Sequence, residues 1–144
     1  MLLNTPSLLI PEIYEVIFRM GHLDELLIAD ANYGASDMSP RVVHSGAPLN
    51  HELLDIVLRY FPLDEDEEFG VHVMIPDYGY AHAPGIWKDY ESVLTRHGYS
   101  GENPLGKIPR KEFYSRSKNA YATIQTGDPR LYADILIRKG VVIK

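Results

Sequence analysis

Two kinds of hydrophobic spacing alternate along this chain, and their alternation is the strongest constraint on its fold. Apolar residues recur at the spacing of a buried helix face in three segments, residues 7–20, 50–61 and 85–97. Short apolar runs of strand length occur at residues 25–29, 70–75 and 134–137. Helices and strands that alternate in this way are typical of layered α/β domains. The sequence therefore predicts a layered α/β fold.

Cap and turn residues set the expected ends of the helices. The first helix is expected to begin near Ser7, with Pro11 in its first turn, and Asn50 is expected to cap the second. Gly98 is expected to end the third helix, and residues 98–109 are expected to form a loop. Each helix thus has a sequence signal for at least one of its ends.

Three further segments carry shorter patterns. A strand is expected at residues 41–44, inside a loop rich in glycine, serine and proline, and a helix at residues 110–118. Residues 119–126 alternate as a strand with one polar face, made of Tyr121, Thr123 and Gln125. That face can line a polar pocket or meet solvent, and we favour solvent.

The composition is that of one ordinary globular domain, expected to span residues 1–144. A net charge of −6 predicts no attraction to nucleic acid without a local basic patch, and the most basic stretch, residues 107–118, also carries acidic and aromatic side chains. The absence of cysteine excludes a disulfide framework and a cysteine nucleophile. No apolar run approaches the roughly 20 residues of a membrane helix, and the N-terminus does not resemble a signal peptide. We expect a cytoplasmic protein that binds neither membranes nor nucleic acid.

Three residues are candidates for chemistry from their positions alone. His22 lies between a helix end and a strand, where functional side chains are often displayed, and a histidine can give and take protons near neutrality. Asp30 ends an apolar strand, a place where α/β sites gather, and Tyr121 lies on the polar strand face. Each also has a plain structural interpretation: a surface histidine in a turn, an aspartate that caps a loop, and an exposed tyrosine.

Metal and cofactor sites are not predicted. The side chains that could bind a metal lack the helical His-to-His spacing of the common zinc motifs; they are His22, Asp24, Asp30, His44, His72 and His82. The sequence contains no glycine-rich phosphate loop and no Gly-x-Ser-x-Gly elbow. We therefore expect neither a metal nor a cofactor.

Two stretches of the sequence carry a family resemblance. Residues 20–31 contain Gly-His, an acidic pair two residues later, an apolar strand and then Asp-Ala. Residues 113–127 begin with Phe-Tyr, and residues 132–140 end with Lys-Gly. Together they resemble the family of L-fucose mutarotases and D-ribose pyranases, the RbsD/FucU family, over nearly the whole chain. The resemblance implies a single domain with a layered α/β/α fold and a central mixed sheet.

The resemblance also implies roles for particular residues. His22 matches the family's proton donor, and Tyr121 matches a tyrosine linked to activity. The residues that match sugar-binding positions are Asp30, Arg110, Tyr132, Ala133 and Asp134. Arg110 stands where the fucose branch has arginine and the ribose branch tends to have histidine, so the resemblance is closer to the fucose branch.

Two positions depart from the family pattern. Asp134 stands where the family usually has asparagine, which replaces an amide donor with a carboxyl group. Asn32 stands where the fucose branch commonly has histidine. Both departures bear on which sugar the chain prefers.

The activity implied by the resemblance is an isomerase that interconverts ring forms or anomers of a monosaccharide, L-fucose or a related sugar. Ring opening needs a proton delivered to the ring oxygen and another removed from the anomeric hydroxyl, which general acid–base groups can supply. The alternatives are a pyranase acting on D-ribose and a sugar-binding accessory protein without catalysis. His22 and Tyr121 favour an enzyme, and Asp134 is the main argument against one.

The separation of His22 and Asp30 constrains the site. They lie eight positions apart with a strand between them, which would span about 26 Å if fully extended at roughly 3.3 Å per residue. Either a turn shortens this span, or the site combines residues from two subunits. The second option agrees with the family, whose members form ring-shaped oligomers with shared sites. We therefore expect a homo-oligomer, an octamer or decamer, with its sites at subunit interfaces.

Overall fold

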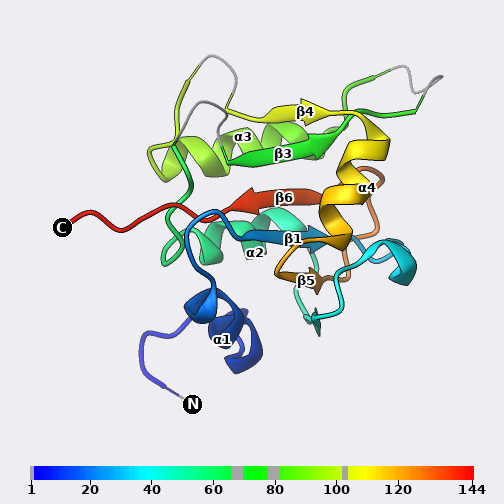
Figure 1. Ribbon diagram of the computed structural model, residues 1–144. Coiled ribbons are helices and arrows are strands. Elements are labelled where there is room, and N and C mark those ends of the chain that lie inside the picture. Colours follow the sequence, from blue (N-terminus) through cyan, green and yellow to red (C-terminus); the bar gives the residue numbers. More distant parts are fainter. Residues whose placement is uncertain (1, 66–69, 78–81, 102–103) are drawn as a thin grey trace.

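Six strands form a single sheet in the part of the chain that the computed structural model describes, residues 2–65, 70–77, 82–101 and 104–144 (Figure 1). Their order across the sheet is β2-β5-β1-β6-β3-β4. The strands are β1 (Glu25–Ala29), β2 (Val42–His44), β3 (Val71–Met74), β4 (Gly106–Ile108), β5 (Ala122–Gln125) and β6 (Ile135–Arg138). Among these described strands, β6 runs antiparallel to both of its neighbours, and the other paired strands are parallel. The predicted mixed sheet is confirmed.

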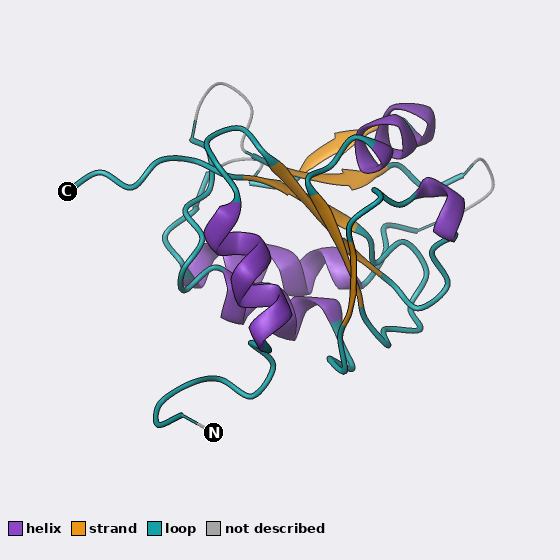
Figure 2. Cartoon of the chain, turned by 60° about the horizontal axis from the view of Figure 1, so that its bottom comes forward, coloured by secondary structure: helices purple, strands orange, loops and turns teal. Residues whose placement is uncertain are grey.

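Helices cover both faces of the sheet, but unequally. One face carries α1 (Pro11–Arg19), α2 (Asn50–Val57) and α3 (Ile86–Arg96). The other face carries α4 (Arg110–Lys118), which contacts the short 3₁₀ helix η1 (Ala35–Asp37) (Figure 2). No helix among the described residues is long and apolar enough to cross a membrane. The arrangement is the predicted α/β/α layering, with a thick and a thin helical layer.

The central strand β1 is buried on both faces because its side chains alternate between two cores. Leu26 and Ile28 pack with the layer of α1, α2 and α3, whereas Leu27 and Ala29 pack with Phe113 of α4. All five side chains are completely buried. A strand covered on both faces appears in the sequence as a continuous apolar run, and the strand predicted at residues 25–29 is confirmed.

Two helix beginnings differ from the sequence prediction. α1 begins at Pro11 and not near Ser7, because Ile10 is extended (ψ 155°), the conformation that a following proline favours. Asn50 does not cap α2; it is the first residue of the helix, and Leu49 takes the cap position. The Asn50 side chain is instead buried and donates from Nδ2 to the carbonyl of Ala133 (2.8 Å).

The segment predicted as a loop at residues 98–109 contains β4. This strand has only three residues and begins with glycine, so it leaves no hydrophobic pattern to detect. Gly106 lies opposite His72 of β3, and an added Cβ would lie 2.6 Å from the His72 Cδ2 atom, so glycine permits the close pairing. At the other end of β3, the strand stops at Met74, and Ile75 is 44% exposed.

The polar face of β5 is covered rather than exposed. Thr123 is completely buried, and its Oγ1 accepts a hydrogen bond from the Ser39 N–H (3.3 Å). Gln125 donates from Nε2 to the carbonyl of Asp30 (3.2 Å). The solvent-facing prediction is wrong because the segment after β1 folds over this face, a contact between residues more than 80 positions apart.

Replacing Gly140 with alanine is expected to lower the free energy of unfolding by about 1–3 kcal/mol, the usual cost of overpacking. An added Cβ would lie 2.7 Å from the carbonyl carbon of Leu63 and 2.9 Å from the nitrogen of Asp64. Both are main-chain atoms, which cannot move aside cheaply. Urea unfolding followed by circular dichroism measures the change.

The matched control for that experiment is Gly46→Ala. An added Cβ at Gly46 meets no described atom within 4 Å. This variant should unfold at the wild-type urea concentration or slightly above it, because alanine restricts the unfolded chain. Equal midpoints for the Gly140 and Gly46 variants would contradict the packing argument.

Candidate active site

Charged residues follow four strands at one edge of the sheet. Asp30 follows β1, Asp77 lies just beyond β3, Arg110 lies just beyond β4, and Asp128 lies just beyond β5. These four strands run in the same direction, so their carboxyl ends meet at one edge, where ligand sites of α/β sheets form. Asp134 precedes the antiparallel strand β6 and therefore lies at the same edge.

A pocket of about 230 Å³ opens at this edge. It is lined by Asp30, Asn32, Tyr33, Gly34, Met74, Asp77, Arg110, Tyr114, Leu131, Tyr132 and Asp134. Four of the five residues predicted to bind sugar are in this list. The fifth, Ala133, is completely buried behind the pocket and does not line it. The lining combines carboxylates, a guanidinium, an amide and phenols, the groups that bind several hydroxyls at once.

The carboxyl groups of Asp30 and Asp134 form the most buried polar part of the pocket. Both residues are only 5% exposed. Oδ1 of Asp134 accepts the main-chain N–H of Asp30 (2.8 Å), and Oδ1 of Asp30 accepts the main-chain N–H of Asn32 (2.7 Å). Burial raises the pKa of Asp30, and the charge of Asp128 adds to that rise. Burial and the neighbouring Asp30 charge raise the pKa of Asp134 well above its ordinary value.

Arg110 forms the opposite, exposed side of the pocket. Its guanidinium pairs with the carboxylate of Asp77 and lies 5.3 Å from the centre of the Tyr114 ring. The hydrogen bond from Arg110 holds the pKa of Asp77 below its usual value. The main-chain N–H of Asp77 donates to the Tyr132 hydroxyl (3.0 Å), so Arg110, Asp77 and Tyr132 form one connected group.

Two tyrosine rings form an aromatic wall between these groups. The rings of Tyr33 and Tyr114 lie 5.8 Å apart, centre to centre. The Tyr33 hydroxyl donates to Oγ of Ser117 on α4 (2.8 Å), and burial raises the pKa of Tyr33 far above its ordinary value. Tyr33 therefore stays neutral at physiological pH and presents an apolar ring face to the pocket.

Buried hydrogen bonds hold the segment that carries Tyr132. The carbonyl of Ala133 accepts from Nδ2 of Asn50 (2.8 Å) and from the hydroxyl of Tyr90. Tyr132 itself has a φ of 59°, a left-handed conformation that is unfavourable for a bulky side chain. Such strain persists only where the surroundings fix it, and it is frequent at ligand sites.

Asp128 fixes the other end of the same segment. It is completely buried and accepts hydrogen bonds from the main-chain N–H of Asn50 (2.9 Å) and from the main chain and guanidinium of Arg130. Arg130 also donates to Asp89 of α3 (3.0 Å). Burial alone would raise the pKa of Asp128, but Arg130 and Asn50 outweigh it and lower that pKa.

His22 lies at the opposite edge of the sheet from this pocket. It sits in the turn before β1, whereas Asp30 lies beyond the other end of that strand. Its Nε2 is 3.6 Å from Oδ1 of the buried Asp64, and its side chain is 45% exposed. With Asp64, Tyr99 and Ile143 it helps to line a cavity of about 510 Å³.

Tyr121 also lies at the edge opposite the pocket. It precedes β5, and its main-chain N–H donates to the carbonyl of Glu25 at the start of β1 (2.8 Å). The guanidinium of Arg41 stacks on its ring, 4.0 Å from the centre. Within one chain, the structure therefore brings together the predicted sugar-binding residues but separates them from His22 and Tyr121.

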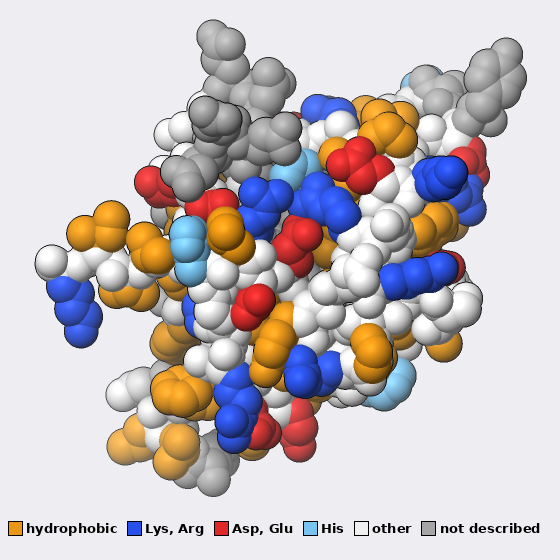
Figure 3. Space-filling model, in the orientation of Figure 1, with side chains coloured by type: hydrophobic (Ala, Val, Ile, Leu, Met, Phe, Trp, Pro, Cys, Tyr) orange, Lys and Arg blue, Asp and Glu red, His pale blue; other side chains and the backbone are white. Residues whose placement is uncertain are grey.

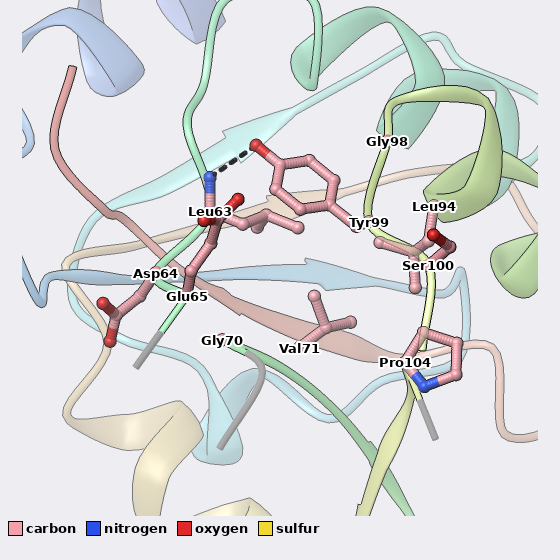
Figure 4. A pocket seen from close by; sticks show the side chains of 10 residues that line it. All are labelled: Leu63, Asp64, Glu65, Gly70, Val71, Leu94, Gly98, Tyr99, Ser100 and Pro104. Carbon is pink, nitrogen blue, oxygen red and sulfur yellow. Dashed lines mark hydrogen bonds between the residues drawn. The ribbon is translucent and has the colours of Figure 1, made fainter. Parts of the chain in front are cut away.

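Another cavity, of about 290 Å³, lies near the start of β3 and the end of α3 (Figure 4). The Tyr99 hydroxyl in it accepts the main-chain N–H of Leu63 (3.0 Å). Figure 4 shows the Asp64 carboxylate pointing away from Ser100 and Pro104 on the far side. The described polar side chains that line this cavity do not point toward one another, unlike those of the pocket at the strand ends. Among the described residues, no three His, Asp or Glu side chains are grouped to hold a metal ion.

Sequence reasoning missed three polar side chains of the pocket: Tyr33, Tyr114 and Asp77. Tyr114 lies one helical turn after Arg110, a spacing that could have placed it on the same face of α4. Asp77 and Tyr33 have no such local signal. They reach the pocket because β1 and β3 end at the same edge of the sheet.

Residues 3–142 match the model of the RbsD / FucU transport protein family. The chain belongs to this family. Human fucose mutarotase is 38% identical over 145 residues, covering 96% of this chain and 93% of the human protein. The zebrafish (Danio rerio) fucose mutarotase is 37% identical, covering 95% of this chain and 92% of its own length.

Solved structures of the RbsD/FucU family share this fold. The crystal structure of the fucose mutarotase from Streptococcus pneumoniae in complex with L-fucose has a TM-score of 0.90 at 33% identity, covering 99% of this chain and all of that one. Bacillus subtilis RbsD, solved with D-ribose, has a TM-score of 0.71 at 18% identity, covering 97% of this chain and 99% of its own. The second likeness concerns the fold alone.

Proposed function

We propose that this chain is a monosaccharide mutarotase, an isomerase that interconverts the anomers of L-fucose or a closely related sugar. The observation that carries the proposal is the pocket at the strand ends, where Asp30, Arg110 and Tyr132 lie together. The names of the relatives support the same substrate, because the human protein is a fucose mutarotase and the pneumococcal one was solved with L-fucose.

The lining of the pocket suits a small polyhydroxylated ligand. The carboxylate of Asp30 accepts hydrogen bonds from sugar hydroxyls, and the guanidinium of Arg110 donates to them. The neutral rings of Tyr33 and Tyr114 offer an apolar surface to the C–H face of the sugar ring. A few placed polar groups beside an apolar wall are the usual composition of a specific small-molecule site.

Catalysis in this proposal is proton transfer. Opening the ring breaks the bond between the anomeric carbon and the ring oxygen, with a proton delivered to the ring oxygen and one removed from the anomeric hydroxyl. Closing on the other face reverses both transfers, so no cofactor is consumed. His22 gives and takes the proton at the ring oxygen, and Tyr121 assists or orients it.

We further propose that His22 and Tyr121 reach the pocket from a neighbouring copy of the chain. Their place at the opposite edge of the sheet supports this, because Asp30 and Arg110 lie beyond the other end of β1. The apolar tail residues beside the His22 cavity, Val141 and Ile143, are 54% and 89% exposed. Apolar side chains gather where the ends of the chain leave the fold (Figure 3), and a ring-shaped homo-oligomer would bury them.

Exchange spectroscopy by NMR tests the proposed function directly. Saturating the resonance of one anomer should transfer saturation to the other faster with the protein than without it, and L-fucose should respond more than D-ribose. A larger effect on D-ribose would favour a pyranase. Binding of L-fucose without faster exchange would favour a non-catalytic sugar-binding protein and overturn the proposal.

A further inference from the structure

Asp30 and Asp134 place two buried carboxyl groups beside each other in the pocket. Both residues are 5% exposed, and Oδ1 of Asp134 accepts the main-chain N–H of Asp30 (2.8 Å). An ionised carboxylate can accept but not donate, so a hydrogen bond between the two side chains needs a proton on one of them. One oxygen of each group, Oδ1, already accepts a main-chain N–H, from Asn32 and Asp30 respectively. A proton shared between the two carboxyl groups is compatible with both of these main-chain hydrogen bonds.

The charges around this pair disfavour ionisation of both carboxyl groups. Asp128, beyond β5, adds negative charge. Burial raises the pKa of the phenols of Tyr33, Tyr90 and Tyr114, on three other segments of the fold, so these groups are neutral and bring no positive charge to the pair. Two carboxylates in contact and out of water cannot both ionise without a large penalty.

The arginines near the pocket are engaged with other carboxylates. Arg110 pairs with Asp77 on the exposed side. Arg130 pairs with Asp128 (2.6 Å) and Asp89 (3.0 Å). These pairs leave the two buried carboxyl groups to be neutralised by a proton.

We propose that Asp134 is a positioning residue that holds the carboxylate of Asp30 in its sugar-binding orientation through one proton shared between the two side chains. The shared proton joins the segment before β6 to the segment after β1, so the pocket keeps its shape only while the proton is present. An asparagine at this position would make the same contact with an amide N–H and would need no proton. This inference rests on the proposed function for its link to sugar binding.

Carboxyl ¹³C NMR of aspartate-labelled protein, without sugar, tests the shared proton. In the wild type, the ¹³C shifts should show that one of the two carboxyl groups remains protonated at pH 6, where an ordinary aspartate is ionised. In Asp134→Asn, Asp30 should be ionised at pH 6, because the asparagine amide donates to it in place of the shared proton. In Asp30→Asn, Asp134 should titrate at lower pH than in the wild type, because the neighbouring charge is gone. Full ionisation of both carboxyl groups at pH 6 in the wild type would overturn the proposal.

Stability gives a second readout that needs no sugar. A carboxyl group whose pKa is raised by folding stabilises the protein most at low pH, and its contribution falls as the pH rises above the unfolded value. The urea midpoint of the wild type should therefore fall relative to that of Asp134→Asn between pH 4 and pH 8. Glu52→Gln, on the exposed side of α2 away from the pocket, should keep the pH dependence of the wild type. A constant difference between wild type and Asp134→Asn would contradict the shared proton.

Kinetic measurements with L-fucose at several pH values then test the positioning role of Asp134. In the wild type, KM for L-fucose should rise about tenfold per pH unit above the second ionisation of the pair, with kcat less affected. In Asp134→Asn this rise should disappear. A wild-type rise that persists in Asp134→Asn would refute the role of Asp134 even if the NMR titration shows a shared proton. If no sugar reacts but the carboxyl titration is as expected, the proposed function fails and the shared proton stands.

Discussion

Replacing His22 with alanine is expected to slow the catalysed exchange of anomers by about 10²–10⁴-fold, the range that a general acid–base group contributes. His22 lies in an exposed turn, so the variant should unfold at nearly the wild-type urea concentration. NMR exchange rates at equal protein concentration measure the effect. His44→Ala is the control, because this exposed histidine on β2 does not line the pocket. Equal rates for the two variants would remove His22 from the mechanism.

Mixing two inactive variants tests whether the active site is shared between subunits. His22→Ala keeps an intact pocket at the strand ends, and Asp30→Asn keeps an intact His22. If each site combines residues of two chains, unfolding and refolding the variants together should restore part of the activity, because some sites receive both wild-type residues. Sedimentation establishes that mixed oligomers have formed. Mixed oligomers with no recovered activity, or a strictly monomeric protein, would contradict the shared site.

Replacing Asp128 with alanine is expected to lower the free energy of unfolding by about 3–5 kcal/mol, the usual result of removing one partner of a buried ion pair. The change leaves the main-chain N–H of Asn50 without its acceptor and removes one of the two carboxylates that pair with the Arg130 guanidinium. The segment that carries Tyr132 and Asp134 would lose its anchor, so sugar binding should weaken as well.

Urea unfolding at several pH values separates this effect from a general loss of packing. Folding lowers the pKa of Asp128, so its contribution is present above the unfolded value and disappears as the pH falls through the lower folded value. The difference in the free energy of unfolding between the wild type and Asp128→Ala should therefore become smaller at acidic pH. Asp37→Ala, which breaks a partly exposed ion pair with Lys118, should lower the free energy of unfolding by at most about 1 kcal/mol. An equal cost for both variants would refute the role of the buried network.

The elements that the sequence predicts correctly are those whose pattern reflects their own burial. The strand at residues 25–29 and the helix at residues 110–118 have the expected bounds. β4 escapes prediction because a three-residue strand shows no alternation, and its position depends on pairing with β3. Asn50 has the local character of a cap, yet its tertiary partner, the carbonyl of Ala133, draws its side chain into the core.

Some residues of the candidate site can likewise be predicted from the sequence, and others cannot. Asp30 and Arg110 were found from motifs in the sequence, and both line the pocket. Tyr33 and Asp77 were not found, because their role depends on which strands end beside each other. The sequence leaves two possibilities for His22 and Asp30, a shortening turn or a wide separation, and in the structure the straight strand β1 holds them apart.

The place of β1 in the sheet has a consequence for how the chain folds during its synthesis. β1 is made well before β5 and β6, the strands that pair with it on its two sides. Until about residue 122 has emerged, β1 lacks the strands that pair with both of its edges, although the helices that cover its two faces have already been made. Contacts this distant in sequence form slowly. The pocket, which joins the end of β1 to the start of β6, can therefore form only at the last stage of folding.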